Sequence, residues 1–271
     1  MSITPQTEPL AKIKSKQIME LLKLGNRLDN RALLDYRPIT VNPNVIGKAE
    51  GSAMVSLGNT KVLVGVKVET GTPYSDTPNL GVLTVNAELL PLAHEIFEPG
   101  PPDENSIELA RVVDRGIRES KSIDLEKLIL VPGKLAYVVF VDVYILNHDG
   151  NLVDASALAA VAALLDTKIP EVIVEENGEV RKTENYKPLP IQECPLPITI
   201  AKIGENLLVD PTLEEETISS AKITITTMRN GGVCAIQKSG TGVFTLDEIV
   251  EAYRIAKEKA AEMRKLICEG G

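Results

Sequence analysis

The chain has 271 residues, of which 44% are apolar and 25% are charged, the balance of a globular protein with a sizeable core. Its formal charge of -9 at pH 7 repels phosphate backbones, so nucleic acid could be held only at a local basic surface. Aromatic residues make up 3% and tryptophan is absent, which excludes an extended base-stacking platform.

The sequence predicts a cytoplasmic protein with no membrane anchor, metal or cofactor. The apolar run at 134–146 is interrupted by Asp142 and is too short to span a bilayer, and the N-terminus lacks the apolar stretch of a signal peptide. The cysteines are scattered, which is typical of free thiols in a reducing compartment, and the histidines have no metal-ligand spacing. These residues are Cys194, Cys234 and Cys268, and His94 and His148.

The first elements in chain order are a helix and a hairpin. Residues 16–24 carry apolar side chains at helical spacing after Ser15 and before Gly25, which predicts a short helix. Two β-branched runs flank the pair Gly58-Asn59, the sequence of a tight turn between two strands. Residues 81–90 predict a further strand.

The next segment predicts helix, sheet and helix. Prolines and a glycine at 99–102 end the preceding element, and acidic residues then open a helix predicted over 103–121. Apolar runs at 125–131 and 133–146 are rich in valine and isoleucine and predict buried strands. The small residues of 156–165 predict a closely packed helix.

The C-terminal part repeats this order. The polar stretch 174–186 predicts a solvated connection or an exposed hairpin with a turn at Asn177-Gly178. Residues 196–210 and 221–240 predict further hairpins, and Thr245 with Glu248 forms a capping box before a long helix. The fold class is therefore α/β (α+β), with an extension over 1–30 and two similar halves at 31–170 and 190–271.

Three arginines lie on one face of the 103–121 helix, because positions three and four apart are neighbours. They are Arg111, Arg115 and Arg118. The spacing leaves two interpretations open: the guanidinium groups grip an anion such as a phosphate, or each pairs with a carboxylate one turn away. The possible pairs are Asp114 with Arg118, Arg115 with Glu119, and Glu108 with Arg111.

An acidic cluster follows a predicted strand at Asp210 and continues through Glu214, Glu215 and Glu216. It could hold a divalent cation or serve acid-base chemistry, or it could simply be a solvated helix start. The Walker, GxGxxG, GxSxG and HExxH signatures are all absent from the sequence. Their absence argues against a kinase or another small-molecule enzyme on a βαβ scaffold.

Several segments resemble the RNase PH superfamily and, within it, the non-catalytic RNase PH-type subunits of the archaeal exosome. FEPGPPDEN and VDPTLEEE are specific to that subunit type, and Asn30 stands where members usually carry glycine. The segments are Arg27-x-Asp29-x-Arg31, GSAMVSLGNTKVLVGVK, FEPGPPDENSIELARVVDRGIRES, HDGNLVDASALAAVAALL and LLVDPTLEEE.

The resemblance implies duplicated βαβα halves, similar to the ribosomal protein S5 domain 2-like fold, in a subunit of a six-membered ring. Silent and catalytic subunits alternate in that ring, a trimer of heterodimers, and RNA-binding cap proteins sit on one face. Its substrate is single-stranded RNA, degraded from the 3′ end by phosphorolysis. An active exoribonuclease of the same type is the alternative function.

Active members hold phosphate with a Gly-Ser/Thr-Arg turn, for which this chain has Asn151, Leu152 and Val153. The resemblance therefore implies a degenerate phosphate site, relic carboxylates at Asp210 and Glu216, and no catalytic residue. It also places Arg111, Arg115 and Arg118 where the silent subunit reaches RNA at its neighbour's active site. Guanidinium contacts to phosphates position a strand without reading its bases.

Overall fold

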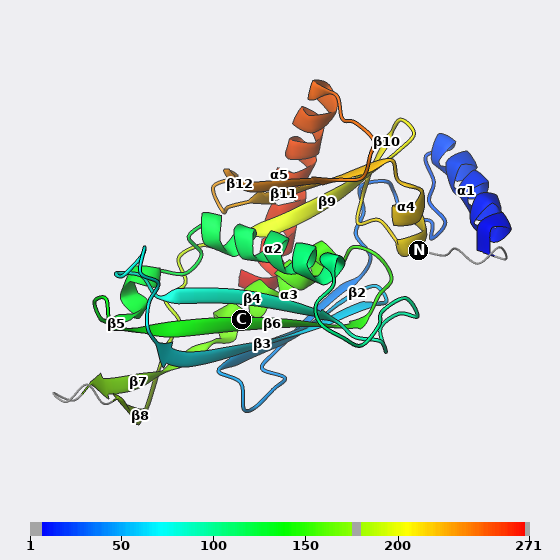
Figure 1. Cartoon of the computed structure of the whole chain (residues 1–271). Coiled ribbons are helices and arrows are strands. Elements are labelled where there is room, and N and C mark those ends of the chain that lie inside the picture. The colour runs from blue at the N-terminus through cyan, green and yellow to red at the C-terminus, as the bar shows by residue number, and fades with distance from the viewer. Residues whose placement is uncertain (1–6, 175–179, 269–271) are drawn as a thin grey trace.

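The computed structural model describes residues 7–174 and 180–268 and contains two main sheets (Figure 1). The first sheet has the order β1-β2-β3-β6-β4, with β5 paired to β6. Only β4 and β6 run parallel; the other pairs in this sheet are antiparallel. The strands are β1 (Ile39–Pro43), β2 (Gly51–Leu57), β3 (Thr60–Gly71), β4 (Val82–Leu89), β5 (Ile129–Val131) and β6 (Leu135–Asn147).

The second sheet is antiparallel, with the order β10-β9-β11-β12, so β12 is an edge strand. A separate hairpin, β7 paired with β8, follows the first sheet and agrees with the exposed hairpin predicted there. The predicted Asn177-Gly178 turn lies outside the described residues. The strands are β7 (Lys168–Val174), β8 (Val180–Pro188), β9 (Leu196–Ile203), β10 (Asn206–Val209), β11 (Ala221–Thr227) and β12 (Val233–Ser239).

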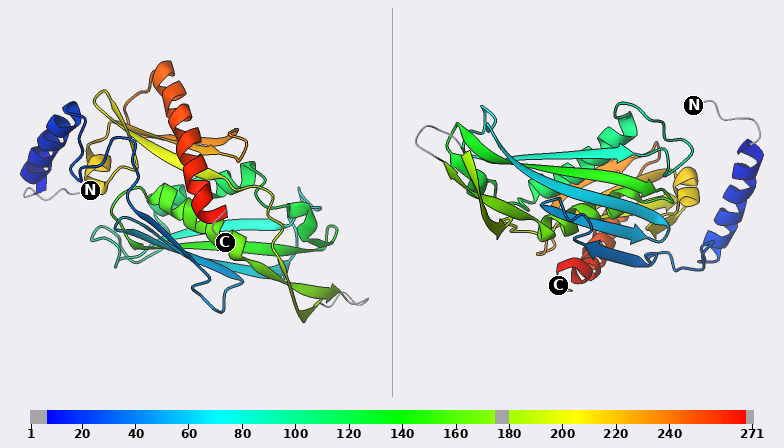
Figure 2. Two further views of the ribbon diagram at one scale, coloured as in Figure 1. Left: turned by 180° about the vertical axis from the view of Figure 1, so that it is seen from behind. Right: turned by 90° about the horizontal axis from the view of Figure 1, so that it is seen from below.

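Helices α2 and α3 lie between the two sheets in Figure 1, and α5 runs across the second sheet in Figure 2. Because α3 and α5 both contact β9, this strand is buried along almost its whole length. The mixed α/β fold class predicted from the sequence is confirmed. The helices are α1 (Thr7–Lys23), α2 (Glu104–Glu119), the 3-10 helix η1 (Leu125–Leu128), α3 (Leu152–Asp166), α4 (Leu213–Ile218) and α5 (Leu246–Cys268).

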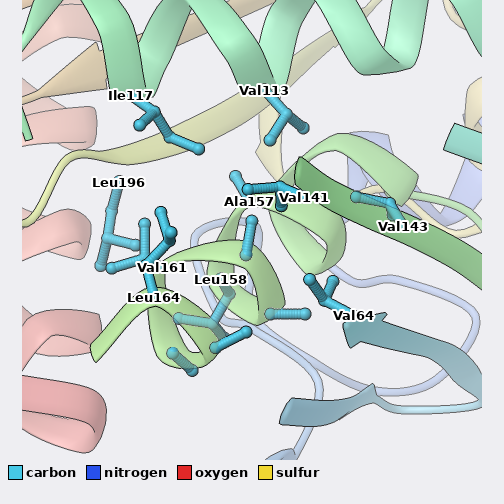
Figure 3. Close-up of a cluster of buried hydrophobic side chains, with 14 of the residues drawn as sticks. Val64, Val113, Ile117, Val141, Val143, Ala157, Leu158, Val161, Leu164 and Leu196 are labelled. Atoms are coloured by element: carbon cyan, nitrogen blue, oxygen red, sulfur yellow. The ribbon is translucent and has the colours of Figure 1, made fainter. Parts of the chain in front are cut away.

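The core is built around α3, which is buried on nearly all sides. Figure 3 shows Val161 of this helix beside Leu196 of β9, with Val113 and Ile117 of α2 above and Leu158 on the lower side of the helix. Small alanines between these larger residues let both sheets approach the helix backbone. Burying each large side chain stabilises the fold by roughly 1.5–3 kcal/mol.

Three predicted boundaries differ from the structure. Helix α1 begins at Thr7, so Ser15 lies inside it and does not cap it. Residues 125–128 form a 3-10 helix instead of a strand. A run of four residues is too short for its hydrophobic pattern to distinguish a helical turn from a strand. Helix α3 begins at Leu152, directly after Asn151 in a left-handed conformation with φ 53°.

The expectation of free thiols is wrong for Cys194, which is disulfide-bonded. Cys234 is free and half-buried, and burial raises the pKa of its thiol to about 11, so it is a poor nucleophile at neutral pH. The side chain of Cys268 lies outside the described residues. In the described part of the chain, no helix combines the length and apolar character needed to cross a membrane.

Asp154 pins α3 to its neighbours. Its buried carboxylate accepts hydrogen bonds from Tyr36 Oη at 2.6 Å, Asn151 Nδ2 at 2.9 Å, and the backbone N and Oγ1 of Thr199 at 3.0 and 2.7 Å. No cation pairs with it among the described residues. Burial therefore raises the pKa of Asp154 to about 6 despite these donors.

This carboxyl should make the fold less stable as pH rises from about 4 to about 6, since the native state keeps a proton that the unfolded chain releases. Asp154→Asn removes the titration, while its amide can donate to Thr199 Oγ1. The unfolding free energy of the variant relative to the parent should therefore increase over that range by about 3 kcal/mol. Urea unfolding at several pH values measures it.

Asp76→Asn is the matched control, because Asp76 is exposed and makes the same change of charge. If the difference in unfolding free energy between the parent and the Asp154→Asn variant stayed constant from pH 4 to 6, the raised pKa of Asp154 would be contradicted.

Candidate functional site

The residues predicted to form a degenerate phosphate site, Asn151, Leu152 and Val153, lie at the start of helix α3. Leu152 and Val153 are half-buried and pack against the main core, so neither offers a hydrogen-bond donor from its side chain. The backbone N of Asn151 donates to Glu216 Oε1 at 3.3 Å, and the same oxygen accepts from Lys222 Nζ at 2.9 Å. The protein's own carboxylate thus faces the positive end of α3, where an external anion would otherwise be favoured.

Asp210, the first predicted relic carboxylate, is fully buried and enclosed by donors. Arg37 donates from its backbone N at 2.9 Å, from Nε at 2.8 Å and from Nη2 at 2.7 Å. Arg31 Nη1 donates at 3.0 Å and Asn151 Nδ2 at 2.8 Å. With its lone pairs occupied and no solvent contact, this carboxylate is fixed in place by its donors.

The charge state of this network follows from its geometry. Burial opposes ionisation of Asp210, but the Arg37 guanidinium outweighs it and holds the pKa of that carboxyl below its usual range. Reciprocally, Asp210 raises the pKa of Arg37 against the effect of burial. The pair is therefore fully ionised at neutral pH.

The Arg-x-Asp-x-Arg motif braces the same region. Arg27 is fully buried and pairs with Glu215, with Nε to Oε1 at 2.9 Å and Nη2 to Oε2 at 2.5 Å. Arg31 pairs with both Asp29 and Asp210. Glu215 also closes a capping box with Thr212 at the start of α4. The segment before β1 is thereby attached to the second sheet by charge-assisted hydrogen bonds.

Each glutamate of the acidic cluster has a cation of its own. Glu214 pairs with Lys14, Glu215 with Arg27 and Glu216 with Lys222. These carboxylates are neutralised without a divalent ion, and the run starts helix α4 with a capping box. Of the two interpretations of this cluster, the geometry favours a helix start.

The three arginines of α2 divide into two kinds. Arg118 is paired with Asp114 at 2.7 Å and donates to the backbone O of Leu83 at 3.0 Å, and Asp114 raises its pKa. Arg111 and Arg115 are exposed, and in the described part of the chain no carboxylate lies within 4.0 Å of either. Of the three pairs considered, only Asp114 with Arg118 forms.

Arg111 and Arg115 line a groove of about 320 Å³ between α2 and β12, which we call the α2 groove. Gln237 of β12 forms its other side and donates from Nε2 to Glu108 Oε1 at 3.2 Å. That contact turns Glu108 toward the strand and leaves Arg111 without its predicted partner. Two unpaired guanidinium groups beside a groove form a candidate anion-binding surface.

Sequence reasoning missed Arg37 and Gln237. Arg37 lies just before β1 and 173 positions from Asp210, and only its place near the Arg-x-Asp-x-Arg motif could have marked it. Gln237 becomes part of the α2 groove through the packing of α2 on β12, which no local pattern reports.

The comparisons with known proteins agree with this architecture. Domains 1 and 2 of the 3′ exoribonuclease family, RNase PH and RNase PH C, match residues 35–170 and 194–259. "Exosome complex component Rrp42" of Thermococcus onnurineus is 56% identical over 97% of this chain and 97% of its own length. The protein of that name from Methanopyrus kandleri is 51% identical, over 95% and 97%.

Among solved structures, a chain of the "archaeoglobus fulgidus exosome with RNA bound to the active site" is 47% identical. It superimposes with a TM-score of 0.87 over 94% of this chain and 98% of that chain. A chain of an "Archaeal exosome core" gives a TM-score of 0.85 at 43% identity, over 96% and 98%. Rice Rrp46, at 17% identity and a TM-score of 0.68 over 89% and 97%, shares the fold alone.

Replacing Asp210 tests the buried network. Asp210→Asn keeps a side chain that tolerates the left-handed backbone, with φ 50°, but leaves the buried Arg37 charge uncompensated. Denaturant unfolding should show a loss of about 3–5 kcal/mol. Asp149→Asn is the matched control, because Asp149 lies 3.6 Å from the same guanidinium at 35% side-chain exposure and should cost less than about 1 kcal/mol. Equal losses in the two variants would refute a special role for Asp210.

Proposed function

The chain belongs to the 3′ exoribonuclease family of RNase PH type, and from that membership we propose that it is a non-catalytic ring subunit of an archaeal-type exosome. One observation carries the absence of catalysis. The start of α3, where active members hold phosphate, carries apolar Leu152 and Val153, and its Asn151 amide is bonded to Glu216. Neither of these apolar side chains can donate a hydrogen bond to a phosphate dianion or orient it for attack.

Its partners in this proposal are a catalytic RNase PH-type subunit, alternating with it in a hexameric ring, and RNA-binding cap proteins. The relatives named as exosome components match nearly their whole length, and a structural neighbour has RNA bound to the active site of its complex. These likenesses support assembly and contact with RNA. We place the assembly in the cytoplasm, as the sequence predicts.

The chemistry then belongs to the neighbouring subunit. An oxygen of inorganic phosphate attacks the phosphorus of the last RNA linkage, and the bond from phosphorus to the preceding 3′ oxygen breaks. A nucleoside diphosphate leaves, and the shortened RNA regains a 3′ hydroxyl. This chain contributes position: Arg111 and Arg115 neutralise backbone phosphates without reading bases, and Arg118, held by Asp114, lies one turn beyond.

The alternative, an active exoribonuclease, lacks support at each position it needs. Asp210 is buried under Arg37 and Arg31, and Leu152 and Val153 provide neither hydroxyl nor guanidinium. A carboxylate that is fixed and dry cannot serve as a general acid for a leaving 3′ oxygen.

We expect the isolated chain to release no nucleoside diphosphate from RNA in phosphate buffer. The reason is the missing phosphate site, so raising the phosphate concentration should not restore activity. Chromatography of the nucleotide products measures it, with the ring assembled from both subunit types as the positive control. Phosphate-dependent release by the pure chain would overturn the non-catalytic assignment.

Changing both Arg111 and Arg115 to Glu should weaken RNA binding and degradation by the assembled ring while leaving ring mass unchanged. Losing two phosphate contacts should make the log-log salt dependence of binding shallower by about 1.4. Affinities at several salt concentrations measure it. The control changes Lys48 and Lys127, exposed and outside the α2 groove, to Glu with the same change of charge. An intact double arginine variant with parental affinity and slope would leave α2 an ordinary solvated helix.

A further inference from the structure

A second basic site lies where the turn that joins β11 to β12 meets α5. Arg229, Arg254, Lys257 and Arg264 line a pocket of about 380 Å³ there, which we call the α5 basic pocket. Its only acidic lining residue is Glu258. We propose that the α5 basic pocket binds a backbone phosphate of single-stranded RNA, separately from the α2 groove.

Arg264 gives the strongest reason for an anion. The residue is 8% exposed, and its Nε donates to the backbone O of Cys194 at 2.9 Å while Nη2 donates to the backbone O and Oγ1 of Thr227. Among the described residues no carboxylate lies within 4.0 Å of its guanidinium. A buried cation held by neutral oxygens alone carries a desolvation cost that an anion in the pocket would offset.

The pKa of Arg264 reports the same imbalance. Burial lowers it from the usual value of an arginine, and Glu193 is close enough to oppose this effect without forming an ion pair. Nearby Arg229 lowers it further, since like charges repel. Nη1 makes no hydrogen bond in the described part of the chain, and so its two N–H donors remain available to an anion.

The remaining cations are only weakly neutralised. Arg229 lies 3.7 Å from Glu193 at 53% side-chain exposure, and Arg254 pairs with Glu251 at 65%. Arg254 holds Glu251 through two hydrogen bonds, from Nε at 2.9 Å and from Nη2 at 2.6 Å, but both pairs are exposed, so a phosphate can compete with the carboxylates for these guanidinium groups. Lys257 is exposed with no carboxylate within 4.0 Å among the described residues. In a chain of charge -9, four cations gathered at one pocket need an explanation.

The turn holds these groups in place. Gly231 has φ 81°, and a Cβ on it would lie 2.7 Å from Lys257 Cε, so the lysine stem runs directly against the turn. Tyr253 Oη donates to the backbone O of Gly231 at 3.1 Å and ties the turn to α5. A site whose cations are fixed before binding loses less conformational entropy on binding.

The lining favours RNA over an acidic protein segment. Protein docking sites depend on large apolar or aromatic anchors, and the apolar contribution here is limited to Gly231 and Ala261. Phosphate contacts need no such anchor and suit the planar guanidinium fork. The choice of RNA among phosphate-bearing ligands rests on the proposed function. Gly231 lies in the turn before β12, and Gln237 lies about 13 Å along the strand from its first residue, Val233, so the pocket and the α2 groove are distinct contacts beside one edge strand.

The test uses the full chain by itself and a fluorescent oligoribonucleotide at several salt concentrations. Changing Arg254 and Lys257 to Glu alters exposed helix positions and spares Arg264, so the fold is retained and circular dichroism verifies it. Losing the contact to one phosphate should make the salt slope shallower by about 0.7, and the loss of affinity should shrink about 2.6-fold from about 50 to about 200 mM salt. The Lys48 and Lys127 control variant should keep the parental values.

Three results would overturn the proposal. Unchanged RNA affinity in the Arg254 and Lys257 variant, with loss in the Arg111 and Arg115 variant, would remove the pocket and leave the proposed function standing. If the Arg254 and Lys257 variant lost orthophosphate binding but kept its RNA affinity, the pocket would be assigned to free phosphate. Polyglutamate binding as tightly as RNA, and lost in the same variant, would assign it to an acidic protein.

Discussion

The ion pair between Asp210 and Arg37 is the interaction on which the arrangement of this chain depends. It joins the segment before β1 to the turn between β10 and α4, and Asn151 adds the start of α3 to the same carboxylate. Taking both charges out of water is costly, so the pair is stable only because every lone pair of Asp210 finds a donor. The position of α3 between the two sheets is set at this point.

That network also bears on the proposed absence of catalysis. The resemblance to active family members places an acid at Asp210, yet here its oxygens are fully committed to Arg37, Arg31 and Asn151. Glu216 likewise faces the start of α3 and Lys222 instead of a substrate. The carboxylates at these positions therefore hold the two sheets and α3 together.

Local signals were readable from the sequence, and distant pairings were not. The capping box of Thr245 and Glu248 and the cap Asp103 predicted helix starts correctly, because both act within one turn. The partner of Asp210 lies 173 positions away, and nothing local reports it. The same holds for the α2 arginines: spacing offered three equivalent ion pairs, and only packing against β12 separates Arg118 from the other two.

If an acidic chain binds RNA, as proposed for this one, its attraction is confined to a few places. Over most of the surface the net field repels the phosphate backbone, which limits unproductive binding, so unpaired cations are effective where they occur. Both such places adjoin β12: the α2 groove beside Gln237 and the α5 basic pocket beside Gly231. Because the lining residues of neither place include an aromatic ring, the proposed contacts would hold RNA by its backbone and would not read its sequence.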